Sequence, residues 1–341
     1  MDWTLILEKA VLVLVVFSFT LVIAMYSTYG ERKIAAFLQD RIGPNRAGPF
    51  GIFQPLADGG KMFFKEEFIP DQSVKWLFIL GPGLAMFLAL MTSAVIPWGP
   101  DLKLDSGVIP LQVADIDIGI LYIFGVLSLG VYGIMLGGWA SNNKYSLLSA
   151  VRASSQIISY ELAMGLSVIA IILMTGSLSL RDIVESQHGM NWNIFYQPLG
   201  FIIFMTTALA ECNRAPFDMA ECETELIGGY HTEYSSMKLG FYLFAEYTNM
   251  FISSAVISVL FFGGYNFPGM DSISDPIWLT VIGTVVFFAK IFFFIFVFMW
   301  IRWTLPRFRY DQLMRLGWKG LIPLAIINLV LTGAFLLVKY L

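Results

Sequence analysis

Long apolar stretches constrain this chain more than any other feature of its sequence. A helix needs about 20 mostly apolar residues to cross a bilayer core, and eight segments meet that requirement. Charged residues make up only 13% of the 341 residues, roughly half the share of a soluble domain. This number of charges is too small to cover a water-exposed surface. The sequence therefore predicts an all-α polytopic membrane protein. The expected spans are 5–26, 76–97, 116–140, 157–175, 195–212, 238–262, 277–303 and 320–340.

The scarcity of cysteine and histidine excludes several classes of protein. Cys212 and Cys222 are the only cysteines, and the chain has two histidines. Neither a disulfide-stapled secreted fold nor an ordinary four-thiolate iron–sulfur cluster is therefore expected. Glycine-rich nucleotide motifs and the H-E-x-x-H zinc motif are also absent from the sequence. We expect no metal site, no nucleic acid as a partner and no redox centre, so any electron transfer belongs to partner chains.

The distribution of positive charge predicts which loops face the cytoplasm. Sixteen of the 21 Lys and Arg residues lie in or at the edges of four loops, four lie on the opposite side, and Lys290 lies inside a span. The positive-inside rule places these loops in the cytoplasm (or the matrix) and both termini on the periplasmic face of a single domain, 1–341. The short acidic loops on the other side are expected to be solvated connectors. The predicted inner loops are 27–75, 141–156, 213–237 and 304–319.

The first inner loop is unusually long, and its composition predicts ordered structure. Its centre, 43–49, is stiff and rich in Gly and Pro. Apolar residues then recur at roughly helical spacing, with Lys61 and Lys65 four positions apart, which predicts an interfacial amphipathic helix. A basic loop that only touches anionic lipid headgroups is the alternative, but the Gly-Pro frame favours a shaped cavity wall. The apolar residues are Leu56, Phe63, Phe64 and Phe68.

Six carboxylates lie within 23 residues after the fifth expected span, answered only by Arg214. Pro216 is expected to end helical structure there. Carboxylates crowded at a membrane boundary titrate as a group, and this is the composition of a proton relay. A solvated acidic loop is the alternative, which the interleaved apolar residues, such as Phe217 and Ile227, make less attractive. The six are Glu211, Asp218, Glu221, Glu223, Glu225 and Glu233.

Three more ionisable residues, Glu161, Glu246 and Lys290, lie inside expected spans. Ionisable side chains at such depth are costly, face the bundle interior and by default mark ion pathways. Glu161 and Glu246 could instead be boundary residues that reach toward the membrane surface. The sequence thus predicts an ion pathway, with that alternative open for the two glutamates.

Four blocks of the sequence resemble a known family, the quinone-site membrane subunits of respiratory complex I. The blocks occur in the family's order and in corresponding inner loops, and the resemblance covers essentially the whole chain. The blocks are GERKIAAFLQDRIGPNRAGPFGIFQPLADGGKMFFKEE, SSQIISYELAMGLS, AECNRAPFDMAECETELIGGYHTEYSSM and RWTLPRFRYDQLMRLGWK.

The resemblance implies a subunit of a proton-translocating NADH:quinone oxidoreductase in a bacterial inner membrane, or a mitochondrial one if organellar. A quinone (ubiquinone or menaquinone) would be the substrate. NADH, flavin and iron–sulfur clusters would belong to partner subunits: the iron–sulfur quinone-module subunits of the peripheral arm and neighbouring small membrane subunits. The positions that match the family's quinone-tunnel residues are Arg32, Arg41, Arg46, Asp58, Lys61, Lys65, Arg214 and Phe217. The positions that match its proton-coupling carboxylates are Glu161, Glu211, Glu221, Glu223, Glu225, Glu233 and Glu246, with Asp218 beside them.

Two other functions remain open at this point. Related anchor subunits occur in membrane-bound hydrogenases and in other reduced-cofactor dehydrogenases. A stand-alone secondary transporter would use intramembrane Glu and Lys similarly, although the sequence shows no internal repeat. Purification in mild detergent would separate the three, because they predict different partners and activities.

Overall fold

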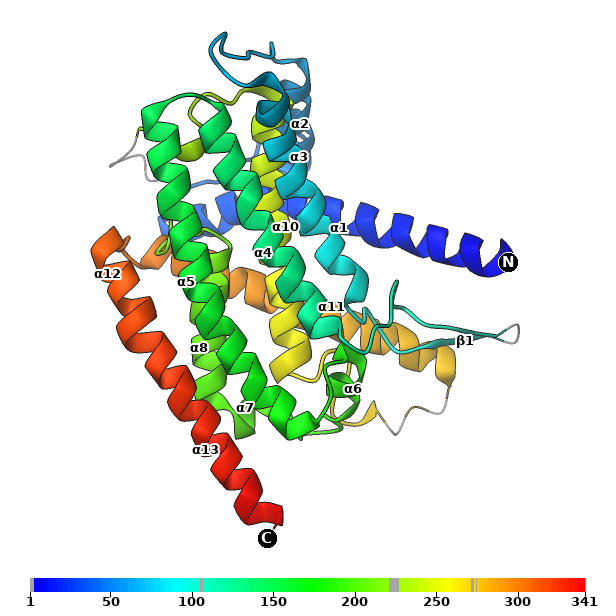
Figure 1. Ribbon diagram of the computed structural model, residues 1–341. Coiled ribbons are helices and arrows are strands. Elements are labelled where there is room, and N and C mark those ends of the chain that lie inside the picture. The colour runs from blue at the N-terminus through cyan, green and yellow to red at the C-terminus, as the bar shows by residue number, and fades with distance from the viewer. Residues whose placement is uncertain (1–2, 105–106, 221–226, 271–272, 274, 341) are drawn as a thin grey trace.

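The computed structural model describes residues 3–104, 107–220, 227–270, 273 and 275–340, and this part of the chain is mostly helical (Figure 1). Seven helices within it are long and apolar enough to cross a membrane. The predicted all-α polytopic fold is therefore confirmed. The long helices are α1 (Trp3–Leu38), α3 (Lys75–Met91), α4 (Gly119–Ala140), α5 (Lys144–Thr175), α10 (Ser236–Phe261), α11 (Pro276–Thr304) and α13 (Ile322–Tyr340), the last extended backward by a π-helical turn (Leu316–Leu321) and α12 (Tyr310–Arg315).

Short elements lie at both ends of the bundle, with α2 at one end and α6 at the other, while α8 runs along the bundle beside α5 (Figure 1). The predicted helix of the first inner loop is present as α2, and its Phe63 and Phe64 are 71% and 90% exposed. Apolar side chains in that position suit a helix that lies on a membrane surface. The short elements are a turn at Pro49–Gly51, α2 (Gln54–Phe64), a turn at Thr92–Val95, the antiparallel strands β1 (Leu102–Leu104) and β2 (Gly107–Ile109), α6 (Leu180–Glu185), α7 (Asn193–Tyr196), α8 (Pro198–Glu211) and a turn at Gly229–His231.

The fifth expected span, 195–212, differs from the prediction. Only α8 is a continuous helix there, and its 14 residues reach about 21 Å, less than a bilayer core. Pro198 begins α8 and lacks a backbone N–H, and Gln197 before it is not helical. The chain then continues as irregular backbone, with residues 211–220 all buried. Non-helical backbone at membrane depth is tolerated where protein covers it.

Two helices extend beyond the expected spans. The first span is expected to end at residue 26, but α1 continues to Leu38, because Glu31 is buried against arginines. The inner loop predicted at 141–156 is also largely helical, since α5 begins at Lys144. Its small polar residues face protein: the Ser149 hydroxyl donates to the Ala220 carbonyl at 2.9 Å. In both cases the hydropathy pattern locates the end of the apolar stretch. It does not predict the further helical turns, whose polar residues are buried against distant parts of the chain.

Small residues let α3, α4 and α10 approach closely. A Cβ at Gly133 would lie 2.9 Å from the Ala85 nitrogen, and one at Gly137 would collide with the Tyr242 hydroxyl. That hydroxyl donates to the Gly133 carbonyl at 3.0 Å. Close backbone packing of this kind is how membrane helices gain van der Waals contact. It fixes the depth at which α10 presents its polar residues.

Lys290, in the middle of α11, is bound by backbone carbonyls. Its ammonium donates to the carbonyls of Phe262, Gly264 and Asn266 at 2.7, 2.8 and 2.7 Å, and it lies 5.0 Å from the Trp192 ring centroid. These carbonyls follow the C-terminal end of α10, where a positive charge is favourable. The lysine thus holds the turn that leads out of α10.

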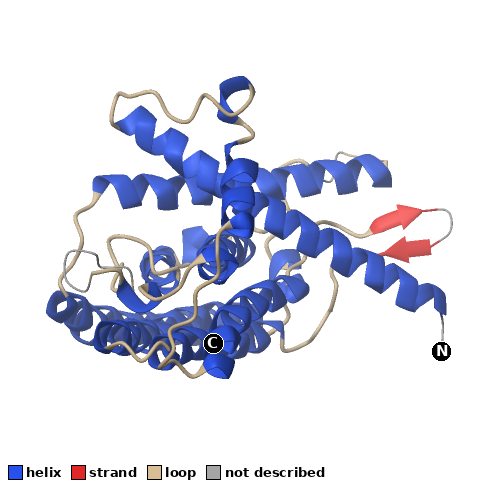
Figure 2. Ribbon diagram, turned by 90° about the horizontal axis from the view of Figure 1, so that it is seen from above, coloured by secondary structure: helices blue, strands red, loops and turns tan. Residues whose placement is uncertain are grey.

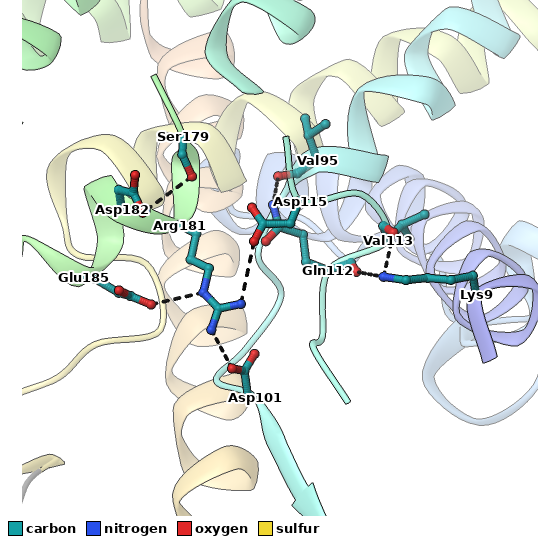
Figure 3. Close-up of polar contacts among 10 residues, drawn as sticks. All are labelled: Lys9, Val95, Asp101, Gln112, Val113, Asp115, Ser179, Arg181, Asp182 and Glu185. Carbon is teal, nitrogen blue, oxygen red and sulfur yellow. Dashed lines mark hydrogen bonds and ion pairs between the residues drawn. The ribbon is translucent and has the colours of Figure 1, made fainter. Parts of the chain in front are cut away.

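The connectors at the β-hairpin end are tied together by side-chain contacts (Figure 3). Arg181 pairs with Asp101 at 2.5 Å, with Glu185 at 3.1 Å and with Asp115 at 3.8 Å. Lys9 of α1 donates to the backbone carbonyls of Gln112 and Val113, in the loop that follows β2. The hairpin therefore lies beside the N-terminal end of α1 (Figures 1 and 2). The acidic connectors are partly solvated, as expected, but they also form a clamp around Arg181.

Candidate functional site

A buried cluster of opposite charges lies where α1, α10 and α11 meet the segment after α8. One carboxylate oxygen of Glu31 lies 3.2 Å from the Arg214 guanidinium, and the other lies 2.5 Å from the Arg302 guanidinium. Arg214 also lies 3.8 Å from the Glu246 carboxylate. Glu31 and Arg214 are only 5% and 4% exposed. Charges buried to this degree are tolerated because each lies beside an opposite charge.

Tyr247 completes this cluster from α10. Its hydroxyl donates to the Glu31 carboxylate at 2.9 Å, and its ring faces the Arg214 guanidinium at 4.1 Å. An arginine over an aromatic face gains cation–π attraction, which is stronger away from water. We call Glu31, Arg214, Glu246, Tyr247 and Arg302 the ion-pair cluster.

A second ion pair joins a buried carboxylate of the same irregular segment to an exposed arginine. Asp218 is 2% exposed and pairs with Arg307 at 2.9 Å. Phe217 beside it packs on the rings of Tyr160 and Phe308, with centroids 5.4 and 5.5 Å away. Phe217 and Arg214 do not line the cavity between α1, α2 and α10 that is described below. The structure therefore assigns them to the protein interior around Asp218 and Glu31.

A small cavity of about 40 Å³ lies between α3, α4, α5 and α10. Its wall is mainly apolar, but it includes two carboxylates, and we call it the polar cavity. Glu211 and Glu246 both line it, and one oxygen of Glu211 has no hydrogen-bond partner among the residues that the structure describes. A water needs at least roughly 10–15 Å³, so the cavity has room for a few waters beside two carboxylates. The other polar residues on its wall are Asn213, Tyr230, Tyr242 and Asn249.

Of the other predicted carboxylates that the structure describes, Glu161, Asp218 and Glu233 do not line this cavity. Glu161 accepts a hydrogen bond from Ser128 across the α4–α5 contact. Glu233 accepts one from Asn143 at 2.7 Å. Glu221, Glu223 and Glu225 lie outside the described residues. The structure thus places two of the predicted carboxylates, Glu211 and Glu246, on one cavity, and it pairs Glu161, Asp218 and Glu233 with other side chains.

A larger cavity of about 130 Å³ lies between α1, α2 and α10. Arg32 and Asp58 line it, paired at 2.5 Å, and Gln54 donates to Asp58 at 3.1 Å. Lys61 lies 3.9 Å from the same carboxylate. The rest of the wall is largely apolar and includes Met25, Pro55, Met62, Leu243 and Phe244, with Tyr247 at its edge toward the ion-pair cluster. We call this space the α1–α2 cavity.

The other basic residues predicted for the first inner loop do not reach the α1–α2 cavity. Arg41, Arg46 and Lys65 are exposed at the α2 end of the molecule. Arg41 donates to the side-chain oxygen of Gln39, a neighbour in the chain, at 2.7 Å. Exposed positive charge on that surface is available to a docking partner.

The α1–α11 contact adds two open apolar grooves of about 370 and 430 Å³ that share Phe19. The helices run in the same direction, because Phe19 meets Phe288 and Glu31 meets Arg302. Within the described ranges, no three His, Cys, Asp or Glu side chains gather as a metal site requires.

Sequence reasoning did not single out Glu31, Tyr247, Arg302 or Arg307. Glu31 precedes Arg32 in the block GERK, but a glutamate after an apolar stretch is usually solvated. Arg302 and Arg307 served only to assign topology. Their carboxylate partners lie 271 and 89 positions away in the sequence, and pairing over such separation leaves no local pattern.

Comparisons with known proteins agree closely with each other. A model of the NADH dehydrogenase family matches residues 10–333. An NADH-quinone oxidoreductase subunit from Flavobacterium johnsoniae is 64% identical over 340 residues, which cover 99% of this chain and 97% of that protein. The corresponding subunit from Cytophaga hutchinsonii is 65% identical over 333 residues, 97% of each chain. The one from Leptospira biflexa is 52% identical over 333 residues, 95% of this chain and 93% of that protein.

Proposed function

Because the chain belongs to the NADH dehydrogenase family, among relatives that are all the same subunit of NADH-quinone oxidoreductases, we propose that its α1–α2 cavity is part of the path of a quinone. The chain is an integral membrane subunit of a multisubunit enzyme, with other complex I subunits as partners. Its identity to these relatives favours this function over a hydrogenase anchor or a stand-alone transporter. Reduction itself takes place with groups that partner subunits supply.

The observation that carries the proposal is the Arg32–Asp58 pair in an otherwise largely apolar wall. A quinone has a long apolar tail and a headgroup with two carbonyl oxygens, so it needs an apolar channel with few polar groups. Arg32 has donors for a carbonyl oxygen, and Asp58 holds its guanidinium in place. Lys61 adds positive charge at the same carboxylate. The remaining quinone-site candidates, Arg41, Arg46, Lys65, Arg214 and Phe217, act in this proposal by docking partners or by shaping the interior.

We further propose that the buried carboxylates couple quinone reduction to proton translocation. Forming a quinol takes up two electrons and two protons. Electrons that arrive before the protons place negative charge near the cavity until the protons follow. Buried charges interact strongly over short distances, because the effective dielectric constant is lower than in water. The ion-pair cluster lies directly behind the α1–α2 cavity, and Glu246 joins it to the polar cavity. The proposed coupling residues are Glu161, Glu211, Asp218, Glu233 and Glu246, with Glu221, Glu223 and Glu225 beyond the described ranges.

Partners and location follow from the same proposal. NADH, a flavin and iron–sulfur clusters in the peripheral subunits would deliver electrons. Those subunits would dock at the α2 end, where Arg41, Arg46 and Lys65 are exposed. The chain would lie in the bacterial inner membrane with its termini in the periplasm.

The test compares Arg32→Gln with Asp58→Asn in the assembled complex. The control is Lys103→Gln, which removes an exposed charge from strand β1, away from the cavity and from the proposed docking surface. We expect both cavity variants to raise the quinone KM by roughly threefold to tenfold, since the pair is partly exposed and screened. Electron transfer from NADH to ferricyanide should be unchanged, because it does not use the cavity. An unchanged quinone KM in both cavity variants would exclude this cavity from the quinone path.

A further inference from the structure

Tyr247 belongs to the ion-pair cluster and also lines the α1–α2 cavity. The cavity wall includes Tyr247 but neither Glu31 nor Arg214. Glu31 is buried behind that wall, and the Tyr247 hydroxyl donates to its carboxylate at 2.9 Å. The α1–α2 cavity and the buried Glu31 therefore meet at Tyr247.

The contacts of Tyr247 leave its ring little freedom to move alone. One face meets the Arg214 guanidinium at 4.1 Å, and Arg214 in turn contacts the oxygen of Glu31 that accepts the tyrosine hydroxyl. Any displacement of the ring must lengthen the bond to Glu31 or shift Arg214. A shift of Arg214 also changes its 3.8 Å approach to Glu246, which lines the polar cavity.

From this geometry we infer that Tyr247 is a positioning residue that transmits occupancy of the α1–α2 cavity to Glu31, Arg214 and Glu246. The inference rests on the proposed function of that cavity. A quinone that presses on the ring changes the hydrogen bond to Glu31 and so redistributes Arg214 between Glu31 and Glu246. The reverse also holds, because coupling between two sites is reciprocal. Tyr247 contacts the substrate only as part of the wall and carries no proton in this scheme.

The first test is Tyr247→Phe in the assembled complex, which removes the hydroxyl and keeps the ring on the cavity wall. A hydrogen bond to a charged group contributes about 1.5–3 kcal/mol, equivalent to roughly tenfold or more in rate. We expect kcat for quinone reduction to fall about tenfold while the quinone KM stays within about twofold. Rates are normalised to NADH:ferricyanide activity, so a smaller amount of assembled complex does not imitate the effect.

The matched control is Tyr122→Phe, which removes a hydroxyl that donates to the Met91 carbonyl at 3.3 Å, away from both cavities. Its kcat and KM should stay within about twofold of the parent values. A higher KM with unchanged kcat in Tyr247→Phe would overturn the inference, because Tyr247 would then be a wall residue only. Unchanged kcat and KM would overturn it as well.

A double-mutant cycle with Glu31→Gln shows whether Tyr247 acts through Glu31. Residues in one network give non-additive effects, whereas independent residues add. We expect the double variant to lose no more kcat than the worse single variant. Additive losses would overturn the route through Glu31. The proposed quinone path fails on a different result, the unchanged KM of Arg32→Gln and Asp58→Asn, so the two failures are distinguishable.

Discussion

Arg214 shows at the residue scale how a membrane protein keeps an arginine away from water. Its guanidinium lies between Glu31, Glu246 and the face of Tyr247. A buried charge is costly unless an opposite charge lies beside it. Removing one member of a buried pair is therefore strongly destabilising, because the other member stays buried without compensation. Arg214 is therefore better described as a structural centre of the site than as a residue of the cavity wall.

Replacing Arg214 with methionine should destabilise the subunit by about 3–5 kcal/mol, because it leaves Glu31 and Glu246 with less compensating charge. Arg214→Lys should lose less, since it keeps the charge but not the planar stacking on Tyr247. Thermal unfolding of the purified complex and the yield on a native gel would measure both. An Arg214→Met complex as stable as the parent would contradict the importance of the cluster.

The sequence predicted which residues of the site are unusual but not how they pair. Glu211 and Glu246 stand out because carboxylates within apolar stretches are rare, and both line the polar cavity. Glu31 and Tyr247 have no such signal, because a glutamate after a span and an aromatic within one are ordinary. Their role depends on α1, α10 and α11 meeting in space, which no local pattern encodes.

At the scale of elements, small residues decide how closely the helices pack. Gly133 and Gly137 lie on the side of α4 that meets α3 and α10, whereas Gly130 of the same helix has open space around it. A substitution in α4 should therefore act through packing at some glycines and through helix propensity at others.

Gly137→Ala should destabilise the bundle by roughly 1–3 kcal/mol, because the added methyl group collides with the Tyr242 hydroxyl. Gly130→Ala is the matched control on the same helix, and it should be neutral or slightly stabilising, since alanine favours helix more than glycine. Thermal unfolding in detergent would compare the two. Equal thermal stabilities of Gly137→Ala and Gly130→Ala would contradict the close packing of α4 against α10 in the structure.

Helix ends were the least predictable feature of the elements. Hydropathy located the apolar centres of seven long helices, but it placed the end of α1 at residue 26 and the start of α5 at 157. The structure has these limits at Leu38 and Lys144. Buried polar residues continue both helices, and a hydropathy average counts such residues as solvent-facing. The fifth span was overestimated for a different reason: its apolar sequence begins at Phe195, but Gln197 is not helical and separates α7 from α8.

At the scale of the whole molecule, the two ends differ in charge and shape. The α2 end carries exposed Arg41, Arg46 and Lys65, whereas the opposite end carries the β-hairpin and the Arg181 clamp (Figures 1 and 3). These three residues are part of the charge bias of the sequence, which predicts that the α2 end faces the cytoplasm.

Alkaline phosphatase fused after Leu341 should be active, because that enzyme folds only outside the cytoplasm and the charge bias places the C-terminus there. A fusion within 66–73, between α2 and α3, should be inactive. The pair of fusions serves as its own control, because each reports on one side of the membrane. The reverse pattern would invert the predicted topology.

The carbonyl cage around Lys290 has a consequence for cation chemistry. Three backbone oxygens surround its ammonium at 2.7–2.8 Å, and rings of backbone carbonyls are also what potassium channels use to replace the hydration shell of K⁺. The lysine therefore acts as a covalently tethered monovalent cation. Lys290→Ala should lower the thermal stability of the subunit, and ammonium or methylammonium should restore part of it where the larger tetramethylammonium does not. Equal responses to the three ions would show that the cage does not select a cation of ammonium size.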